Sequence, residues 1–127
     1  MPRVLIVDDH MELRLLFSRG LRNAGFAFTT ANNGVEALAA IESDPPDLIL
    51  LDVFMPEMSG PQFLEHLREK PVTPPIPIVL LSAVAEHPEV EYAMTLVPRK
   101  FLRKGSFSME ELIQTVRESL PESPNQN

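Results

Sequence analysis

Cysteine is absent from this sequence of 127 residues. Its absence excludes a disulfide framework, a zinc-thiolate site and a thiol nucleophile, so any chemistry here must use oxygen and nitrogen groups. Long apolar runs are also missing, whereas a membrane-spanning helix needs roughly 20 apolar residues. The first residues, Met1-Pro2-Arg3, lead directly into a predicted strand rather than into a signal peptide. We therefore expect a cytoplasmic protein with no membrane partner.

Basic residues are scarce as well. The chain has 11 Lys and Arg against 18 Asp and Glu, a formal net charge of −7. Proteins that bind nucleic acids by themselves need a basic face that displaces counterions, so this balance weighs against direct nucleic-acid binding. We therefore expect protein partners. Hydrophobic residues make up 44% of the chain, which suits one ordinary globular domain.

Short continuous apolar runs predict the strands of a parallel sheet. Such runs are typical of strands buried on both faces, where apolar and polar residues no longer alternate. The second strand is weaker, because its apolar run is broken. The predicted strands are 4–7, 26–30, 48–51, 78–81 and 101–102.

Helical spacing of apolar residues fills the intervals between these strands. Gly60-Pro61 predicts the start of the third helix, because proline is tolerated at the first helical position. Ser108 and Glu111 form a capping-box pattern at the start of the last helix. The four prolines of 71–77 exclude a helix there and predict a stiff loop. The predicted helices lie between His10 and Gly25 and over 35–42, 60–70, 88–96 and 108–120.

This alternation predicts an α/β fold with five parallel strands and five helices, doubly wound so that helices cover both faces of the sheet. Asn33-Gly34 predicts a turn before the second helix. Residues 1–120 form the predicted domain, and the polar residues 121–127 form a flexible tail or the start of a linker.

Polar residues lie just past the ends of four of the predicted strands. They are Asp8, Asp9, Asp52, Ser82 and Lys104. In open α/β sheets, ligands bind outside the carboxyl ends of the strands. Carboxylates held close together repel one another unless a cation lies among them, and Mg²⁺ prefers oxygen ligands. The sequence therefore predicts a magnesium site at this edge of the sheet.

Each of these residues also has a simpler interpretation when taken alone. Asp8-Asp9 suits a helix N-cap, Ser82 a hydroxyl bonded to backbone, and Phe101 a core ring. The intervals of 43, 30 and 22 residues that separate Asp9, Asp52, Ser82 and Lys104 favour a common site instead. No metal-ligand spacing links the three histidines, and we assign no ligand role to His10, His66 or His87.

These motifs resemble the receiver domain of bacterial two-component response regulators. The resemblance runs from 4–9 through 51–60 to 101–104, nearly the whole chain, and the intervals above are within the usual range of that family. It implies a flavodoxin-like fold and a phosphorelay signalling switch rather than an enzyme. Its implied partners are a sensor histidine kinase or phosphotransfer protein, and a downstream protein or an output domain outside this chain.

The resemblance also implies roles for the site residues. Asp52 would accept a phosphoryl group from phosphohistidine, and Lys104 would pair with the phosphate. The Ser82 hydroxyl would donate to a phosphoryl oxygen, and this movement would let the ring of Phe101 swing inward. The implied Mg²⁺ ligands are Asp8, Asp9, Asp52 and the backbone carbonyl of Phe54.

Three features depart from the family pattern. Gly105 stands where a proline usually follows the lysine, which puts the family's cis bond and the placement of Lys104 in question. Residues 94–100 replace the usual small and acidic run before the switch aromatic. Phe54 and Val84 are apolar at positions that influence how water reaches the phosphoryl group, so we hypothesise a long-lived phosphoaspartate.

Two alternatives to the switch remain open. The departures at Gly105 and in residues 94–100 allow a degenerate receiver that acts as a docking scaffold without phosphorylation. An aspartate-nucleophile phosphatase also combines an aspartate, Mg²⁺ and a lysine. That second class needs a further aspartate two residues after the nucleophile, where this sequence has Phe54.

Overall fold

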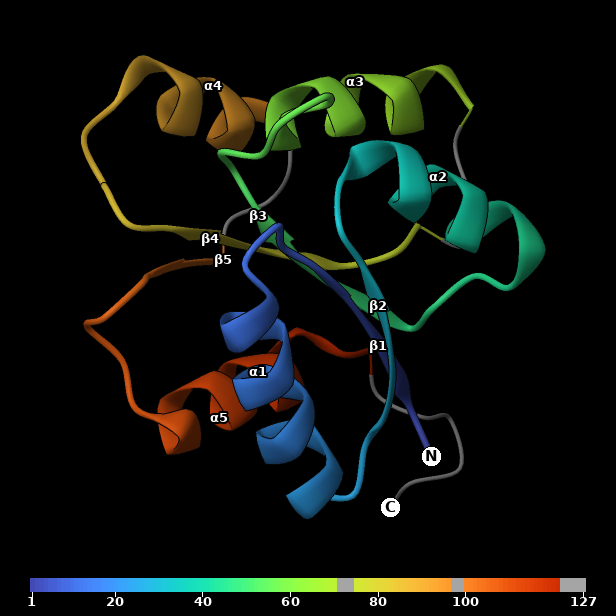
Figure 1. Ribbon diagram of the computed structural model, residues 1–127, viewed down its shortest axis with the longest axis vertical. Coiled ribbons are helices and arrows are strands. Elements are labelled where there is room, and N and C mark those ends of the chain that lie inside the picture. The colour runs from blue at the N-terminus through green and yellow to red at the C-terminus, as the bar shows by residue number, and fades with distance from the viewer. Residues whose placement is uncertain (71–74, 97–99, 122–127) are drawn as a thin grey trace.

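The computed structural model describes residues 1–70, 75–96 and 100–121, and within these ranges five strands alternate with five helices (Figure 1). The strands are β1 (Arg3–Val7), β2 (Ala27–Ala31), β3 (Leu48–Asp52), β4 (Ile78–Ser82) and β5 (Lys100–Arg103). The helices are α1 (Met11–Asn23), α2 (Gly34–Ser43), α3 (Gly60–Glu69), α4 (Pro88–Leu96) and α5 (Met109–Ser119).

All five strands form one parallel sheet in the order β2-β1-β3-β4-β5. The predicted doubly wound α/β fold is therefore confirmed. Because the strands are parallel, their carboxyl ends lie along one edge, and β3 is the central strand. The polar residues predicted to form the site, such as Asp8 and Asp52, lie at this edge.

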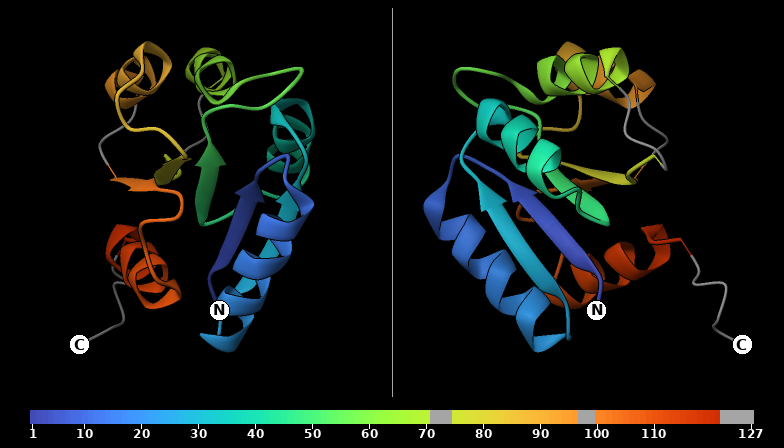
Figure 2. Two further views of the ribbon diagram at one scale, coloured as in Figure 1. Left: turned by 60° about the vertical axis from the view of Figure 1, so that its left-hand side comes forward. Right: turned by 90° about the vertical axis from the view of Figure 1, so that its right-hand side faces the viewer.

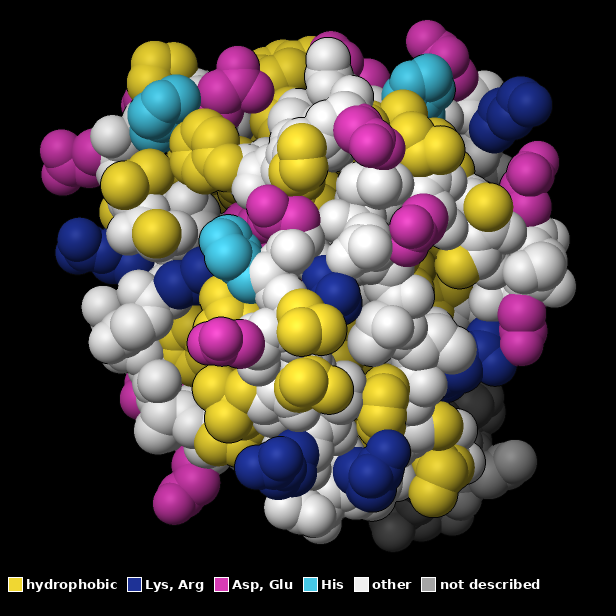
Figure 3. Space-filling view, viewed as in Figure 1, with side chains coloured by type: hydrophobic (Ala, Val, Ile, Leu, Met, Phe, Trp, Pro, Cys, Tyr) yellow, Lys and Arg dark blue, Asp and Glu magenta, His cyan; other side chains and the backbone are white. Residues whose placement is uncertain are grey.

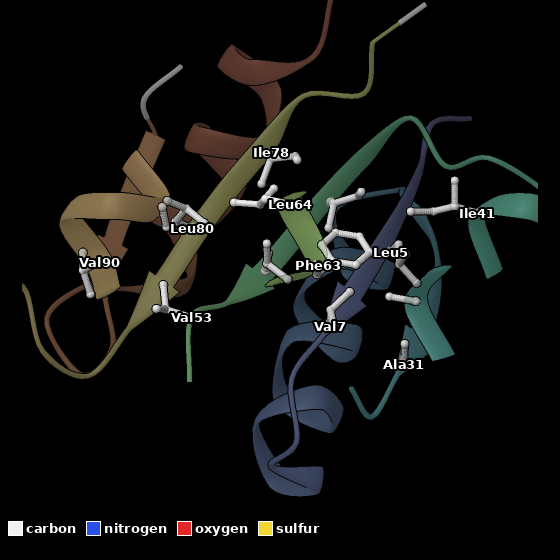
Figure 4. Packing of buried hydrophobic residues seen from close by; sticks show 14 residues of the cluster. Leu5, Val7, Ala31, Ile41, Val53, Phe63, Leu64, Ile78, Leu80 and Val90 are labelled. Atoms are coloured by element: carbon white, nitrogen blue, oxygen red, sulfur yellow. The ribbon is translucent and has the colours of Figure 1, made fainter. Parts of the chain in front are cut away.

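Helices cover both faces of the sheet, as Figure 2 shows. The core between the sheet and helices α1 and α5 includes Phe17, Leu21 and Leu112. The core on the opposite face lies under α2, α3 and α4, and Phe63 is its largest fully buried side chain (Figure 4). Every residue of β3 and β4 is buried, because both faces of these strands are covered. Among the described residues, no helix combines the length and apolar character of a membrane span.

The helix ends follow from local capping. Ser59 and Ser108 each form a capping box, so the predicted starts of α3 and α5 are confirmed. Asn33-Gly34 is not a separate turn, because the Asn33 side chain accepts the backbone N–H of Glu36 and caps α2. The second strand begins one residue later than predicted, and Phe26 precedes it as a buried core residue.

Three predicted segments fall partly outside the described residues. The described part of the proline-rich loop, 75–77, contains no helix or strand. Its residues 71–74, residues 97–99 before β5, and the predicted tail from 122 onward lie outside the described ranges. The fourth helix, between the last two strands, is present as predicted.

Gly60, the first residue of α3, holds the β3–α3 loop close to the end of β3. A Cβ at this position would lie 2.7 Å from the Asp52 carbonyl oxygen and 2.9 Å from Val53 Cα. We predict that Gly60→Ala lowers the free energy of unfolding by about 1–3 kcal/mol, because these backbone atoms cannot move away cheaply. Urea denaturation measures this change.

Gly34 is the matched control, since it is the first residue of α2 in the same way. A Cβ at Gly34 would meet only the flexible side chain of Met58, at 2.8 Å. Gly34→Ala should therefore stay within about 1 kcal/mol of the wild type. Equal losses in the two variants would contradict the proposed backbone constraint at Gly60.

Candidate functional site

The carboxyl edge of the sheet collects the polar residues that the sequence singles out. Asp8 follows β1, Asp52 ends β3, Ser82 ends β4 and Lys104 follows β5. Asp8 and Ser82 are fully buried, and Asp52 is only 2% exposed. Strands β1, β3 and β4 thus each bring one buried polar side chain to the carboxyl edge of the sheet. Asp9 lies beside them and is partly exposed.

Lys104 is the cation that joins this cluster. Its Nζ lies 2.9 Å from Asp8 Oδ2 and 3.2 Å from Asp52 Oδ2. These two buried carboxylate oxygens are close enough for ion pairing, yet neither accepts a hydrogen bond of good geometry, and neither does Asp9 Oδ1. Buried charged oxygens without hydrogen bonds are costly unless a cation compensates them. The cluster therefore suits a metal ion with oxygen ligands.

Asp52 carries an altered proton affinity. Burial is the largest effect and raises its pKa from 3.8 to about 6, because the charged form loses its hydration. The charge of Lys104 opposes this rise, while the neighbouring charges of Asp8 and Asp9 add to it. Near neutral pH the carboxylate is mostly ionised and poorly hydrated, which suits a nucleophile or a metal ligand.

A glycine turn holds Lys104 in place. The Lys104 backbone N–H donates to the Ser82 carbonyl oxygen at 2.8 Å, and the Ser106 N–H donates to the Arg103 oxygen at 3.1 Å. Between them Gly105 has a φ of 82°, which proline cannot adopt because its ring fixes φ near −65°. The departure from the family pattern therefore corresponds to a different turn. Lys104 nevertheless lies within ion-pair distance of Asp52.

The acidic pair does not cap the first helix with its side chains. α1 begins at Met11, and no side chain provides a cap at its N-cap residue, His10. Instead, Asp8 Oδ1 accepts the backbone N–H of His10 at 2.9 Å and lies 3.0 Å from His10 Nδ1. His10 Nδ1 is also 3.3 Å from Asp9 Oδ1.

His10 is the site residue that sequence reasoning missed. Donor atoms of Asp8, Asp9, His10 and Asp52 all lie within 4.8 Å of one another, and no other such cluster is present among the described residues. Its position directly after two acidic residues at a strand end is the available sequence signal. Spacing between histidines was uninformative, because the other donors come from carboxylates.

Ser82 and Phe101 share one face of the sheet. Phe101 is half-buried, packs against the core under α2, α3 and α4, and pairs in register with Leu80. Ser82 lies two residues after Leu80, so its side chain projects toward the same face. The Ser82 Oγ accepts the backbone N–H of Val84 at 3.2 Å.

Apolar and aromatic groups occupy the loops after β3 and β4. The rings of Phe54 and His87 meet edge to face with their centroids 4.8 Å apart. Phe54 and Val84 are 38% and 41% exposed. An aromatic contact therefore connects the two loops that follow the strands of Asp52 and Ser82.

Comparison with known proteins identifies the family. The family model described as the response regulator receiver domain matches residues 4–117. The chain belongs to this family. Receiver domains are signalling domains of two-component systems that work through phosphorylation, bind Mg²⁺ at an acidic pocket, and interact with histidine kinases and output domains. In this receiver domain the described residues contain the acidic cluster of such a pocket.

Several relatives and solved structures are similar to this receiver domain. The probable transcriptional regulatory protein TcrX of Mycobacterium tuberculosis is 36% identical over 114 residues, which cover 90% of this chain and 47% of that protein. The chain thus spans about half the length of this curated relative, and 23% of a protein-glutamate methylesterase of Rhodospirillum rubrum that is 42% identical over 68% of the chain.

Two solved structures share the whole fold. The chemotaxis response regulator CheY4 of Vibrio cholerae has 32% identity and a TM-score of 0.85, covering 94% of this chain and 99% of that one. The response regulator TrrA of Thermotoga maritima, solved in complex with Mg²⁺ and BeF, has 32% identity and a TM-score of 0.82. The match with TrrA covers 94% of this chain and 100% of that one.

The raised pKa of Asp52 predicts a pH-dependent stability. The folded protein keeps the Asp52 proton up to about pH 6, whereas an unfolded chain loses it near pH 3.8. Between these two pH values the folded state binds more protons, so the free energy of unfolding falls as pH rises. We expect Asp52→Asn to be more stable than the wild type by roughly 1–3 kcal/mol above pH 6 without divalent cations. Below pH 5 the difference should shrink.

Urea denaturation in EDTA at pH 4.5 and 7.5 measures this dependence. The control is Glu42→Gln, which neutralises an exposed carboxylate near the end of α2 and should follow the wild type at both values. If Asp52→Asn differed from the wild type by the same free energy at both pH values, the burial effect on Asp52 would be contradicted.

Proposed function

We propose that this receiver domain is a phosphorylatable switch in which Asp52 accepts a phosphoryl group from the phosphohistidine of a sensor kinase or phosphotransfer protein. One observation carries the proposal. Asp52 ends the central strand, is 2% exposed, and has the ammonium of Lys104 at 3.2 Å. Asp8 and Asp9 supply further carboxylate oxygens within 4.8 Å of it.

The proposed transfer forms a bond between an Asp52 oxygen and phosphorus while the bond from phosphorus to the donor imidazole breaks. The electron pair of the broken bond returns to the imidazole nitrogen. Negative charge spreads over the equatorial phosphoryl oxygens, and Lys104 neutralises part of it. When bound by Asp8, Asp9, Asp52 and the backbone carbonyl of Phe54, Mg²⁺ supplies further positive charge.

Ser82 and Phe101 are the proposed relay. A phosphoryl group on Asp52 offers the Ser82 O–H a charged acceptor, and a charge-assisted hydrogen bond is stronger than a neutral one. In the present structure Ser82 Oγ only accepts, from the backbone N–H of Val84. Phe101 is half-buried on the same face of the sheet, so a displaced Ser82 leaves room for its ring to turn inward. Phosphorylation then shifts the balance between two conformations of the α4–β5 side.

The outer face of α1 supports a protein partner. Met11, Leu15 and Leu16 of this helix are 50–63% exposed. Figure 3 shows hydrophobic and basic side chains gathered on the face that α1 occupies. α1 begins three residues after Asp8, so a protein that brings a phosphohistidine to Asp52 can contact these side chains.

The two alternatives find less support. The scaffold interpretation rests on Gly105 and on the altered segment 94–100, of which residues 97–99 lie outside the described ranges. At the first of these, the turn at Gly105 keeps Lys104 within ion-pair distance of Asp52. The phosphatase interpretation needs a general acid at position 54, and Phe54 has no proton to donate. We therefore keep phosphorylation as the proposed function.

Intact-mass analysis tests phosphorylation. After incubation with a small phosphodonor and Mg²⁺, the wild type should carry one phosphoryl adduct, because Asp52 is the proposed nucleophile. Asp52→Asn and the wild type in EDTA should carry none. Asp47→Asn, an exposed aspartate just before β3, is the matched control and should be modified like the wild type. A folded wild type without any adduct would favour the docking scaffold.

The decay of that adduct tests the apolar side chains beside the site. Phe54 and Val84 follow Asp52 and Ser82 by two residues each, and we expect their bulk to hinder the attacking water. Phe54→Ala combined with Val84→Ala should speed the loss of the phosphoryl group about tenfold, equivalent to about 1.4 kcal/mol of barrier.

Met94→Ala is the control for this measurement. Met94 lies on α4 and is 37% exposed, close to the value for Phe54, so the substitution removes a similar apolar surface away from the site. It should leave the lifetime unchanged. A wild-type half-life of seconds rather than many minutes would argue against shielding.

A further inference from the structure

His10 is folded over the acidic cluster rather than pointing away from it. The His10 side chain is 61% exposed to solvent. Even so, its Nδ1 lies 3.0 Å from Asp8 Oδ1 and 3.3 Å from Asp9 Oδ1. An exposed histidine on a loop has many other rotamers. Asp8 Oδ1 is a hydrogen-bond partner of this nitrogen, and Asp9 Oδ1 lies within ion-pair distance of it, so the ring faces the cluster.

The four donors fit around one ion. Donor atoms of Asp8, Asp9, His10 and Asp52 lie within 4.8 Å of one another. Metal bonds to nitrogen and oxygen donors are about 2.0–2.2 Å long, so ligands on opposite sides of an ion are about 4.0–4.4 Å apart. The limit of 4.8 Å exceeds this span by about 0.4 Å, so the donors need to approach by only a few tenths of an ångström to bind one ion.

Buried oxygens provide an independent indication of a cation. Asp8 Oδ2 and Asp52 Oδ2 are buried and accept no hydrogen bond, and the Lys104 ammonium is the cation beside both. With Asp9, the three carboxylates and one ammonium have a formal net charge of −2. A divalent ion balances this charge, and the low exposure of Asp8 and Asp52 prevents water from doing so.

We infer that His10 is a direct nitrogen ligand of the metal site, which therefore prefers a divalent first-row transition ion over Mg²⁺. Imidazole is a good ligand for such ions, whereas carboxylates and water suffice for Mg²⁺. The inference deepens the proposed function, because it uses the same carboxylates, but it concerns which ion the site selects. It does not depend on phosphoryl transfer.

The experiment compares Co²⁺ with Mg²⁺ in the full chain by isothermal titration calorimetry. The test variant is His10→Gln, which keeps a hydrogen-bond donor but loses the imidazole ligand. Because even outer partners of metal ligands contribute about 10–100-fold to affinity, His10→Gln should weaken Co²⁺ binding at least about tenfold. Mg²⁺ binding should change less than about twofold, since Mg²⁺ is held by the carboxylates.

The matched control is His66→Gln, which removes an exposed histidine on α3. It should leave both affinities at the wild-type values. Proton NMR of the Co²⁺ form gives a direct readout, since an imidazole N–H on a Co²⁺ ligand has a strongly shifted exchangeable signal. We expect one such signal in the wild type and in His66→Gln, and none in His10→Gln.

Two outcomes would overturn the inference. Equal weakening of Co²⁺ and Mg²⁺ binding in His10→Gln would mean that His10 only orients Asp8 through a hydrogen bond. A wild type without the shifted N–H signal would mean that the ring does not bind the ion. Phosphorylation is measured separately, by the mass adduct on Asp52. A missing adduct together with an intact Co²⁺ signal would therefore contradict only the proposed function and not the role of His10.

Discussion

The structure depends on burying negative charge at the carboxyl ends of β1 and β3, two of the three inner strands of the sheet. Asp8 and Asp52 are almost completely inaccessible, and the only cation that contacts both among the described residues is Lys104. Buried carboxylates lose hydration, and this loss raises the pKa of Asp52 to about 6. The fold accepts an unfavourable arrangement here, which is typical of a site whose ligand carries the missing charge.

The rest of the molecule keeps these groups together. Parallel strands place their carboxyl ends at one edge, and two buried cores fix the sheet between helices on both faces. Glycine residues and local hydrogen bonds then determine the loop conformations. Gly60 allows α3 to begin close to the Asp52 carbonyl oxygen. The turn at Gly105, and the hydrogen bond that the Lys104 backbone N–H donates to the Ser82 carbonyl oxygen, fix the position of Lys104. The site is therefore held by rigid elements and short turns, as charge compensation over about 3 Å requires.

Sequence reasoning predicted the elements well where one physical signal dominated. The buried strands β3 and β4 are continuous apolar runs, and the Gly60-Pro61 pair and the capping box at Ser108 mark the starts of α3 and α5. It was less accurate for Asn33-Gly34, where a helix cap and a turn share residue preferences. His10 was overlooked because its partners Asp8 and Asp9 are carboxylates, so histidine spacing carries no information about them.

The sequence by itself determined the alternation of strands and helices, the chemical types at the strand ends and the membership of the receiver family, because periodicity, caps and motif intervals are local properties. Only the tertiary structure decided that Lys104 reaches both Asp8 and Asp52 despite Gly105, and that the His10 ring turns toward the acids. The Lys104 contacts depend on distances between residues far apart in the chain. The His10 orientation depends on a side-chain rotamer that the sequence does not specify, and burial sets the cost of each charge.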